Sequence, residues 1–466
     1  MPELHHRIGL DFPPQEVFAW HERPGGLERL VPPWTKLGVC SLAAEAEKVP
    51  CLQLRLGLGP VRLNWELVRK ERRADELLVY EQLEGPFESW RWERRFEPTP
   101  AGGTAVVDLV RWKSPPGLLG GAFSEAGVRE TLRRALEFQA GSLPVDLDRV
   151  QRYGPGAGRS VAITGATGLV GTALGHLLGA SGFRVRRISR SPYGGRGERE
   201  DWVRWDPGAE QLPSAPLEGL HAFVHLAGES IAGARWTRAK KEAILASRVE
   251  GTSLVSRTLA ELDRPPEVLI SASAVGYYGH RGVETLNEES DPGRGFLAEV
   301  CKRWEASTHH ARARGIRTVH LRSGLILSAR GGPLETLLIP FGLGLGGRIG
   351  TGRQYLSWID LDDQAGIIMH AMTEDSVRGA INVTSPNPVT NTVFTDILGR
   401  VLRRPTLIPL PGIAVGALLG EMGIELLLSG QRVFPEKALS SRYQFRFPHL
   451  EDSLRHQLGR PEGIHE

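Results

Sequence analysis

The stretch VAITGATGLVG, residues 161–171, decides the fold that this sequence predicts. Its first four residues are apolar or β-branched, which indicates a buried strand that runs into a glycine-rich turn and then into an apolar helix. Gly165, Gly168 and Gly171 have the spacing GxxGxxG. In such a unit the first glycine permits the tight turn, the second lets the backbone approach a pyrophosphate, and the third lets helix and strand pack closely. The residues that we expect to bind a dinucleotide here are Gly165, Thr167, Gly168, Leu169, Val170 and Gly171.

The sequence after this turn repeats the same alternation of short apolar runs and helical stretches. Short apolar runs between helices are typical of strands that are buried on both faces of a parallel sheet. We therefore predict an α/β domain with a doubly wound parallel Rossmann sheet. The four further strand runs are FRVRRISRS (183–191), HAFVHLAG (221–228), EVLISASAVG (267–276) and IRTVHLRSGLIL (316–327).

The charge at the end of the second predicted strand distinguishes NAD from NADP. An NAD site needs an acidic side chain there for the ribose 2′-hydroxyl, and no Asp or Glu occurs in residues 165–197. The strand ends instead in RRISRSP, where Arg190 is flanked by Ser189 and Ser191. An arginine at this place can pair with the 2′-phosphate of NADP, a charge-assisted contact worth about 1.5–3 kcal/mol. NADP is therefore the expected cofactor, and the alternative is that Arg190 is a solvated surface residue.

Four more positions complete the predicted cofactor site. Asp206 in VRWDP follows a further short strand, VRW (203–205), which is the third along the chain, and could accept a hydrogen bond from the adenine amino group. Ala227 and Gly228 follow the next strand, and their small size lets the backbone come close to the cofactor. Ser271, in the strand run after that, is the last residue that we expect to contact it.

The first third of the chain has a different pattern and is separated from the rest by residues 149–159, a Gly- and Arg-rich stretch that we predict to be a linker. Residues 52–58 (LQLRLGL) and 61–67 (VRLNWEL) have an apolar side chain at every second position, as in antiparallel strands. Residues 124–143 predict a long closing helix. This part is therefore predicted to be an α+β domain in which a curved sheet wraps around one helix.

The order of these elements resembles the helix-grip fold of the polyketide-cyclase/START-like superfamily. The resemblance covers residues 1–148 and rests on FPPQEVFAW (12–20), EGPFESWRWERRFEP (84–98) and GTAVVDLVRWKSPPG (103–117). It implies an apolar ligand between sheet and helix. The alternative is that the aromatic side chains simply fill the core. These side chains are Trp65, Trp90, Trp92 and Phe96.

Residues 160 to about 400 resemble the extended short-chain dehydrogenase/reductases, a group that includes sugar-nucleotide epimerases. Several motifs narrow the resemblance to an atypical subgroup known only as epimerase family proteins, some of whose relatives are linked to bacterial or plastid division. The tail is similar to the subgroup's own small C-terminal domain, so we predict a Rossmann domain over 160–404 and a helical domain over 405–466. The motifs are LAGESIAGARWTRAKKEAILASRVEGT (226–252), SASAVGYYG (271–279), FLAEVCKRWE (296–305), GLGGRIGTGRQYLSWIDLDD (344–363) and NVTSPNPVTN (382–391).

The resemblance implies four catalytic positions, and this sequence keeps one of them. Ser273 matches the serine that steadies the substrate oxygen, whereas Arg248 replaces the active-site asparagine. The tyrosine and lysine of the family's YxxxK pair lie one helical turn apart, so that the lysine lowers the tyrosine pKa. Phe296 and Val300 occupy these two places. Phenylalanine has no proton to donate, and losing a positioned general acid typically costs roughly 10²–10⁴-fold in rate.

Two neighbouring tyrosines are candidates for the missing acid. Tyr277 and Tyr278 follow Ser273 closely, but they leave the strand by a different loop, and the alternative is that they are structural. Lys302 lies six residues after Phe296, about 240° further round the helix, so it cannot take over the direction of the lost lysine.

A polar pocket over the nicotinamide is a further possibility that the sequence leaves open. Arginines in such a pocket would suit an anionic substrate. Each of its members can equally be explained as a structural residue. They are Arg248, Glu229, Ser273 and Arg353.

Composition excludes several other classes of protein. Hydrophobic residues make up 41% of the 466 residues and charged residues 24%, as in a soluble globular protein. The formal net charge of +3 gives no electrostatic reason to expect nucleic acid as a partner. The most apolar segment, residues 412–430, is interrupted by Glu421 and Glu425, so we expect no membrane span. The N-terminus has no basic start followed by an apolar run, so we expect a cytoplasmic protein.

Cysteine and histidine positions predict neither a disulfide framework nor a metal site. None of the three cysteines forms a CxxC pair, and neither His-His pair has cysteine or carboxylate at ligand spacing. The cysteines are Cys40, Cys51 and Cys301, and the histidine pairs are His5–His6 and His309–His310.

Together these patterns predict an NADP-binding oxidoreductase or epimerase-like protein with a non-standard active site. The alternative is a non-catalytic NADP(H) sensor or scaffold, related to division, whose N-terminal domain binds an apolar ligand. An intact nucleotide motif beside a missing YxxxK pair is compatible with both. The sequence specifies neither the substrate nor the oligomeric state.

Overall fold

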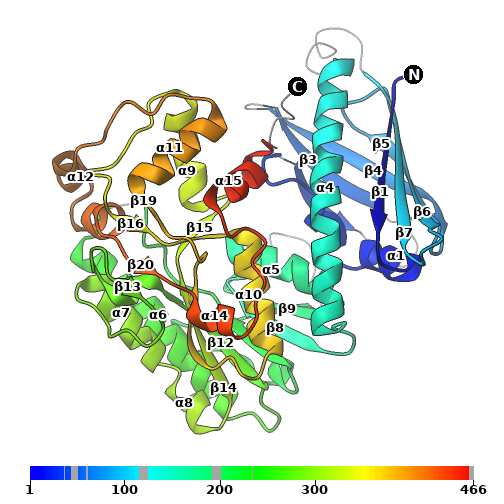
Figure 1. Ribbon diagram of the computed structural model, residues 1–466. Coiled ribbons are helices and arrows are strands. Elements are labelled where there is room, and N and C mark those ends of the chain that lie inside the picture. Colours follow the sequence, from blue (N-terminus) through cyan, green and yellow to red (C-terminus); the bar gives the residue numbers. More distant parts are fainter. Residues whose placement is uncertain are drawn as a thin grey trace. The chain divides into compact units, whose positions relative to one another are not determined.

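The computed structural model describes residues 1–35, 37–42, 51–58, 61–114, 124–191, 201–233 and 235–460. The chain folds as two compact units (Figure 1). Met1–Pro155 forms most of the first unit, and Gly156–Leu178 with Phe183–Glu466 forms the second. None of the described helices is long and apolar enough to cross a membrane.

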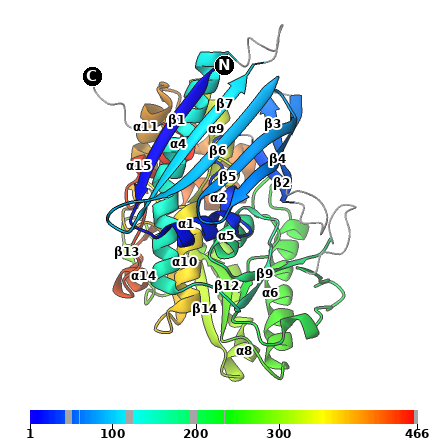
Figure 2. The same cartoon turned by 90° about the vertical axis from the view of Figure 1, so that its right-hand side faces the viewer.

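The first unit is a seven-stranded antiparallel sheet that packs on one long helix, α4 (Glu125–Tyr153) (Figure 2). The order of its strands is β1-β7-β6-β5-β4-β3-β2. This architecture confirms the predicted α+β domain. The strands are β1 (Glu3–Leu10), β2 (Leu37–Leu42), β3 (Cys51–Leu58), β4 (Val61–Arg73), β5 (Leu77–Glu84), β6 (Ser89–Pro98) and β7 (Thr104–Lys113), and the two short helices are α1 (Pro14–Glu22) and α2 (Gly26–Arg29).

Helix α4 is longer than the sequence pattern predicts. It starts at the N-cap Ser124, whose side chain accepts a hydrogen bond from Gly127 N. It then continues past Pro144 to Tyr153, so residues 149–153 are helical although we predicted a linker there. Packing and charge explain the extension, because Val150 contacts the core and Arg149 Nη1 pairs with Asp146 Oδ1 at 3.2 Å.

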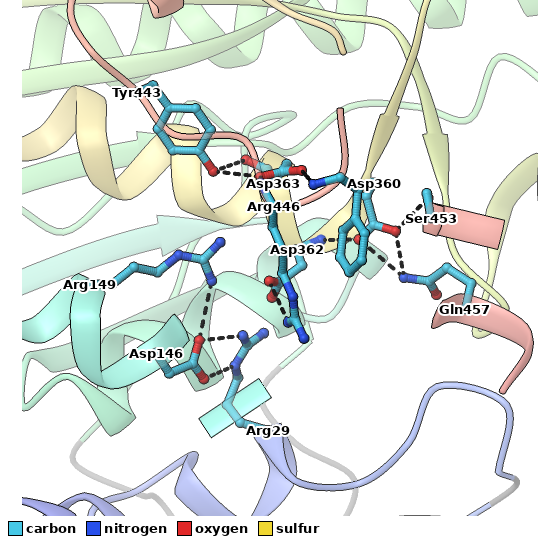
Figure 3. Close-up of polar contacts among 11 residues, drawn as sticks. Arg29, Asp146, Arg149, Asp360, Asp362, Asp363, Tyr443, Arg446, Ser453 and Gln457 are labelled. Atoms are coloured by element: carbon cyan, nitrogen blue, oxygen red, sulfur yellow. Dashed lines mark hydrogen bonds and ion pairs between the residues drawn. The ribbon is translucent and has the colours of Figure 1, made fainter. Parts of the chain in front are cut away.

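Aromatic and polar side chains together hold sheet and helix in the first unit. Trp65 and Trp90 are buried with their rings 4.8 Å apart, as expected for core residues. Arg94 of β6 donates to both oxygens of Asp108 and to Gln139 Oε1 on α4. Asp146 on α4 also accepts two hydrogen bonds from Arg29 on α2, at 2.7 and 2.6 Å (Figure 3).

The second unit contains a seven-stranded parallel sheet with the order β10-β9-β8-β11-β12-β14-β18. In chain order this is 3-2-1-4-5-6-7, so the winding reverses between β8 and β11, where ligands bind in doubly wound sheets. Val224 of β11 pairs with Ile163 and Ile270 on either side, and all three are fully buried. The predicted Rossmann sheet is therefore confirmed. The strands are β8 (Ser160–Thr164), β9 (Arg184–Ser189), β10 (Trp202–Arg204), β11 (Ala222–His225), β12 (Val268–Ala274), β14 (Arg317–Ser323) and β18 (Gly379–Val383).

Side chains cover the open edge of this sheet at β18. Lys437 Nζ donates to the carbonyls of Arg378 and Ala380 at 2.8 and 2.6 Å. Glu288 Oε1 accepts from Asn382 N at 3.0 Å. These contacts satisfy backbone groups that would otherwise be free to pair with another strand.

The C-terminal segment packs on the same unit through buried carboxylates at the start of α10 (Leu361–Thr373) (Figure 3). Asp360 accepts from Ser453 Oγ at 2.7 Å and from Gln457 Nε2 at 3.1 Å, both on α15 (Leu450–Leu458). Asp363 accepts from the hydroxyl of Tyr443 at 2.9 Å. The other helices of this unit are α5 (Leu169–Ala180), α6 (Arg238–Ala260), α7 (Phe296–Ala306), α8 (His309–Ala313), α9 (Gly332–Gly342), α11 (Asn391–Leu402), α12 (Gly412–Leu419), α13 (Glu421–Gly423) and α14 (Glu436–Ser440).

Candidate functional site

The glycine-rich turn between β8 and α5 has the geometry of a phosphate-binding loop. Gly165 has φ +66°, and a Cβ atom there would lie 3.0 Å from Ala227 N. A Cβ atom on Gly171 would lie 2.3 Å from the carbonyl oxygen of Gly165. Both positions therefore require glycine. Thr167 and Gly168 are exposed at the start of α5, where the first N–H groups of a helix have no intrahelical acceptor and can bind an anion.

The turn is tied to the loop after the neighbouring strand β11 by a residue that the sequence pattern did not single out. Thr164 Oγ1 accepts from Leu226 N at 3.1 Å and from Ala227 N at 3.3 Å. It also shares a 2.7 Å hydrogen bond with Nδ1 of the buried His225. The predicted cofactor residues Gly165 and Ala227 thus lie side by side at the point where the sheet reverses.

Residues at the end of β9 lie at the same sheet edge. Arg190 is exposed, and Ser189 Oγ donates to Ser191 O at 3.1 Å. Lys240 is the main cause of a lowered pKa of Glu229, and Arg190 contributes to it as well. Arg190 therefore acts electrostatically on the loop after β11, and its contact with a 2′-phosphate stays a prediction.

Two other predicted cofactor residues have local partners. Asp206 Oδ1 accepts from Gly208 N at 3.0 Å and from Ala209 N at 3.2 Å, so one carboxylate oxygen stabilises its own turn. Ser271 is fully buried, and its hydroxyl donates to Ala272 O at 3.4 Å. Their contacts with a cofactor remain predictions.

Arg248 braces the backbone of the loop after β11. Its Nη1 donates to Glu229 O at 2.9 Å and to Ile244 O at 3.1 Å, and its guanidinium lies 4.9 Å from the centre of the Trp304 ring. A Cβ atom on Gly228 would lie 3.4 Å from Arg248 Cζ, so the loop and the arginine pack closely. Burial lowers the pKa of Arg248.

The Ser273 hydroxyl forms a hydrogen bond with a member of a buried ion pair. It donates to Glu305 Oε1 at 2.8 Å, and the serine is only 4% exposed. Arg322 Nε and Nη2 donate to the two oxygens of the same carboxylate at 2.9 and 3.0 Å. In this structure the serine hydroxyl orients the Glu305 carboxylate between two strands and a helix, and its contact with a substrate oxygen stays a prediction.

Tyr277 and Tyr278 lie on the other side of Arg322. The Tyr278 hydroxyl donates to Asn382 Oδ1 at 2.7 Å and accepts from Arg322 Nη1 at 3.0 Å. This side chain is fully buried, and burial raises its pKa to about 12. The half-buried Tyr277 ring has its centre 3.5 Å from Arg322 Cζ. Both tyrosines therefore stack on or bond to the arginine of the buried pair.

The place of the missing tyrosine is filled by a packed aromatic ring. Phe296 lies 5.1 Å from Trp236 and 4.6 Å from Lys241 Nζ, measured to ring centres. Its backbone N–H donates to Glu425 Oε1 at 2.9 Å, and that of Leu297 donates to Glu425 Oε2 at 3.1 Å. Glu425 therefore caps the N-terminus of α7 from a segment far along the chain.

Two further candidates for the polar pocket over the nicotinamide have the following surroundings, and the pocket itself stays a prediction. Glu229 Oε1 pairs with Lys240 Nζ at 2.6 Å, and Arg353 is exposed, with no ion pair among the described residues. Within the described ranges, no group of three or more His, Cys, Asp and Glu side chains is arranged to hold a metal ion. Cys301 is a buried free thiol, whereas the side chains of Cys40 and Cys51 lie outside the described residues.

Comparison with known families finds a separate family match in each of three parts of the chain. Residues 161–384 match the NAD dependent epimerase/dehydratase family. Residues 1–148 match the polyketide cyclase / dehydrase and lipid transport family, and residues 410–457 match a domain of unknown function, DUF1731. Fold and site thus define a protein with the nucleotide-binding architecture of the epimerase/dehydratase type.

Similarity to individual proteins shows the family to which the chain belongs. The chain is 38% identical over 297 residues to epimerase family protein YfhF of Bacillus subtilis, covering 63% of this chain and 96% of the relative. It is 37% identical over 300 residues to epimerase family protein SDR39U1 of Homo sapiens, covering 63% and 98%. The chain therefore belongs to the epimerase family proteins, with an NAD(P)-binding fold.

Two solved structures are similar over different lengths. A nucleoside-diphosphate sugar epimerase from Corynebacterium glutamicum aligns with a TM-score of 0.79 and 31% identity, covering 98% of this chain and 90% of that one. Human SDR39U1 (isoform 2), solved with NADPH, aligns with a TM-score of 0.58 and 35% identity, covering 64% and 99%. The first match therefore covers nearly the whole chain, and the second about two thirds of it.

Proposed function

We propose that the second unit binds NADP(H) and does not carry out the tyrosine-dependent chemistry of the wider dehydrogenase group. The observation that carries this proposal is the packing of Phe296 between Trp236 and Lys241, in the place of the proton donor. The residues at the other catalytic positions also have structural partners: Ser273 bonds to Glu305, and Arg248 bonds to backbone carbonyls. By contrast, the glycine-rich turn is open at Thr167 and Gly168.

NADP(H) is preferred over NAD(H) in this proposal for two reasons. Arg190 directly follows β9, where a dinucleotide fold holds the ribose, and residues 165–197 contain no acidic side chain that would bind a 2′-hydroxyl. Human SDR39U1, a relative at 35% identity, was solved with NADPH. The test is a pair of titrations of the purified full-length chain with NADPH and with NADH. We expect NADPH to bind about 10–100-fold more tightly, whereas equal affinity would contradict the preference.

A second candidate function is an oxidoreductase that uses a different proton donor. Lys241 favours it, because its ammonium lies 4.6 Å from the Phe296 ring centre and is held by both oxygens of Glu421 at 2.8 and 2.9 Å. Carbonyl compounds and nucleoside-diphosphate sugars form the test panel, the latter because the Corynebacterium relative is described as an epimerase of such sugars. If this candidate is right, Lys241→Met abolishes NADPH oxidation, and Lys240→Met, at the adjacent residue, does not.

We also propose that the first unit binds an apolar small molecule with one polar group. Its match to the polyketide cyclase / dehydrase and lipid transport family supports this. In addition, the indole N–H groups of Trp65 and Trp90 are buried without a hydrogen-bond partner among the described residues, so they could donate to a ligand oxygen. Mass spectrometry of an organic extract of the purified protein tests the idea, and an extract without any enriched small molecule would count against it.

A further inference from the structure

A cavity of about 630 Å³ opens on the second unit, away from the glycine-rich turn. It lies over β14 and the start of β18, beside the end of α7 and α8. Strand β14 is three strands from β8 in the sheet, a separation of about 14 Å at the usual strand spacing. The cavity is therefore a different place from the proposed cofactor site. Its charged or titratable lining residues are Glu305, Arg312, Arg317, His320, Arg322 and Arg378.

Two of these arginines are available to a ligand. Arg322 is neutralised by Glu305, and Arg317 donates to backbone carbonyls such as those of Ala371 and Met372. Arg312 and Arg378, in contrast, are exposed, and Arg378 donates through Nε to a backbone carbonyl, Asp375 O, at 3.1 Å. In the part of the chain that the structure describes, neither has a carboxylate partner. Two guanidinium groups without counter-charge at one cavity suit a phosphate or carboxylate group.

Hydrogen bonds assign the protonation of His320 in the cavity wall. Thr308 Oγ1 donates its one proton to Glu305 O at 2.8 Å. The 2.9 Å contact between Thr308 Oγ1 and His320 Nε2 must then be donated by the histidine. The ring is neutral because burial lowers its pKa to about 4, although the negative charge of Glu305 acts in the opposite direction. Its Nδ1 therefore carries no proton and accepts hydrogen bonds.

We propose that this cavity binds a hydroxylated anion, such as a sugar phosphate or a hydroxycarboxylate. Arg312 and Arg378 hold the anionic group, and His320 accepts a hydrogen bond from a hydroxyl. A sugar phosphate or a hydroxycarboxylate can occupy the arginines and the histidine at once, through an anionic group and a separate hydroxyl, whereas inorganic phosphate has no second group. The site does not depend on the proposed cofactor function, because it shares none of the cofactor residues.

The test uses the full-length protein with glucose 6-phosphate, citrate and inorganic phosphate as calorimetric titrants. We expect glucose 6-phosphate or citrate to bind, with inorganic phosphate at least about tenfold weaker. Preference between the first two identifies the anionic group as phosphate or carboxylate. Arg312→Glu combined with Arg378→Glu should weaken binding by at least about a hundredfold. Both side chains are exposed, so the fold is retained, which a thermal unfolding curve verifies.

A matched control is Arg314→Glu, which changes the charge of an exposed arginine two residues from Arg312 and outside the cavity lining. It should leave binding within about twofold. Saturating NADPH should also leave it unchanged. The proposal is wrong if neither glucose 6-phosphate nor citrate binds. It is also wrong if Arg314→Glu weakens binding as much as the Arg312 and Arg378 double variant does. Displacement of the anion by NADPH would overturn it as well, because the anion would then lie in the nucleotide site.

Discussion

At the scale of single residues, two positions decide how a nucleotide can be held. Arg190 is an exposed cation at the end of β9, and Gly165 is a left-handed residue pressed against the next loop. Arg190 supplies positive charge for a phosphate, and the missing side chain of Gly165 leaves room for the loop after β11. Each leads to a prediction with its own control.

Replacing Arg190 by alanine should weaken NADPH binding by about 10–100-fold and leave NADH binding nearly unchanged, since only NADPH carries the 2′-phosphate. Arg264→Ala is the control, because its largely exposed side chain lies in the loop that precedes β12, at the opposite ends of the strands. Fluorescence titration with both dinucleotides measures the effect. A parallel loss of NADH affinity would show that Arg190 acts on the fold instead.

Replacing Gly165 by alanine should destabilise the protein by about 2–4 kcal/mol, as the sum of a strained φ and a close contact with Ala227. Gly282→Ala isolates the first contribution, because Gly282 has φ +61° but nothing within 4 Å of the position that the new methyl group would take. It should cost only about 1 kcal/mol. Urea unfolding gives both values, and equal costs would mean that the close approach carries no energy.

At the scale of elements, the site depends on contacts that link distant segments. The nucleotide-binding strand–turn–helix unit could be predicted because all its determinants lie within residues 161–171. The partner of Ser273 could not, because Glu305 is 32 residues away and is selected by how α7 packs on β12. Glu425 is a clearer case, since it caps α7 across 129 residues. In the sequence, Glu425 stands out only as a charged residue within an apolar stretch, which does not indicate that it caps a helix.

The cap on α7 leads to a prediction of its own. Glu425→Ala removes the acceptor of two N–H groups and a negative charge at a helix N-terminus, which should cost about 1–2 kcal/mol of unfolding free energy. Glu299→Ala, on the exposed face of the same helix, removes a first-turn carboxylate and its surface ion pair with Lys302 but no side-chain acceptor of the first N–H groups, and should cost less than about 1 kcal/mol. Chemical denaturation compares the two, and a larger cost for Glu299 would refute the capping role.

The link between α10 and α15 should make stability depend on pH. Burial raises the pKa of Asp360 to about 7 from an ordinary value of 3.8, so the folded protein holds a proton that the unfolded chain releases. This carboxyl therefore favours the folded state below about pH 4, and its contribution is lost as the pH rises to about 7. Asp360→Asn should stabilise the protein relative to wild type increasingly from pH 4 to pH 7. A pH-independent difference in unfolding free energy would contradict the shift.

At the scale of the whole molecule, buried neutral histidines should set the acid limit of both units. Burial lowers the pKa of His21 to about 3 in the first unit, and that of His225 and His320 to about 4 in the second. Each contributes stability above the ordinary pKa of 6.5 that is lost as the pH falls toward the folded value. Thermal unfolding temperatures should therefore fall between pH 6.5 and pH 4, and fall more steeply in Asp360→Asn, which lacks the opposing carboxyl. Unchanged temperatures over this range would be the contrary result.

Both fold classes could be predicted because strand alternation and helix periodicity are local patterns. The chemistry of the site was harder to predict from the sequence, because a sequence does not show which partners a side chain bonds to. In the structure, Ser273 and Arg248 form hydrogen bonds within the fold. Tyr278 is an example: it lies close to Ser273 in sequence, but its side chain is fully buried and bonds to Asn382 of β18.

Above all, we expect NADP(H) to bind to this protein without serine- and tyrosine-dependent turnover. A single-turnover experiment puts this to the test, with NADPH bound to the full-length protein and mixed with carbonyl compounds and nucleoside-diphosphate sugars. Bound NADPH should stay reduced, or be oxidised at the same rate in wild type and Ser273→Ala. Oxidation in wild type that Ser273→Ala slows by about a hundredfold or more would refute the proposed loss of this chemistry.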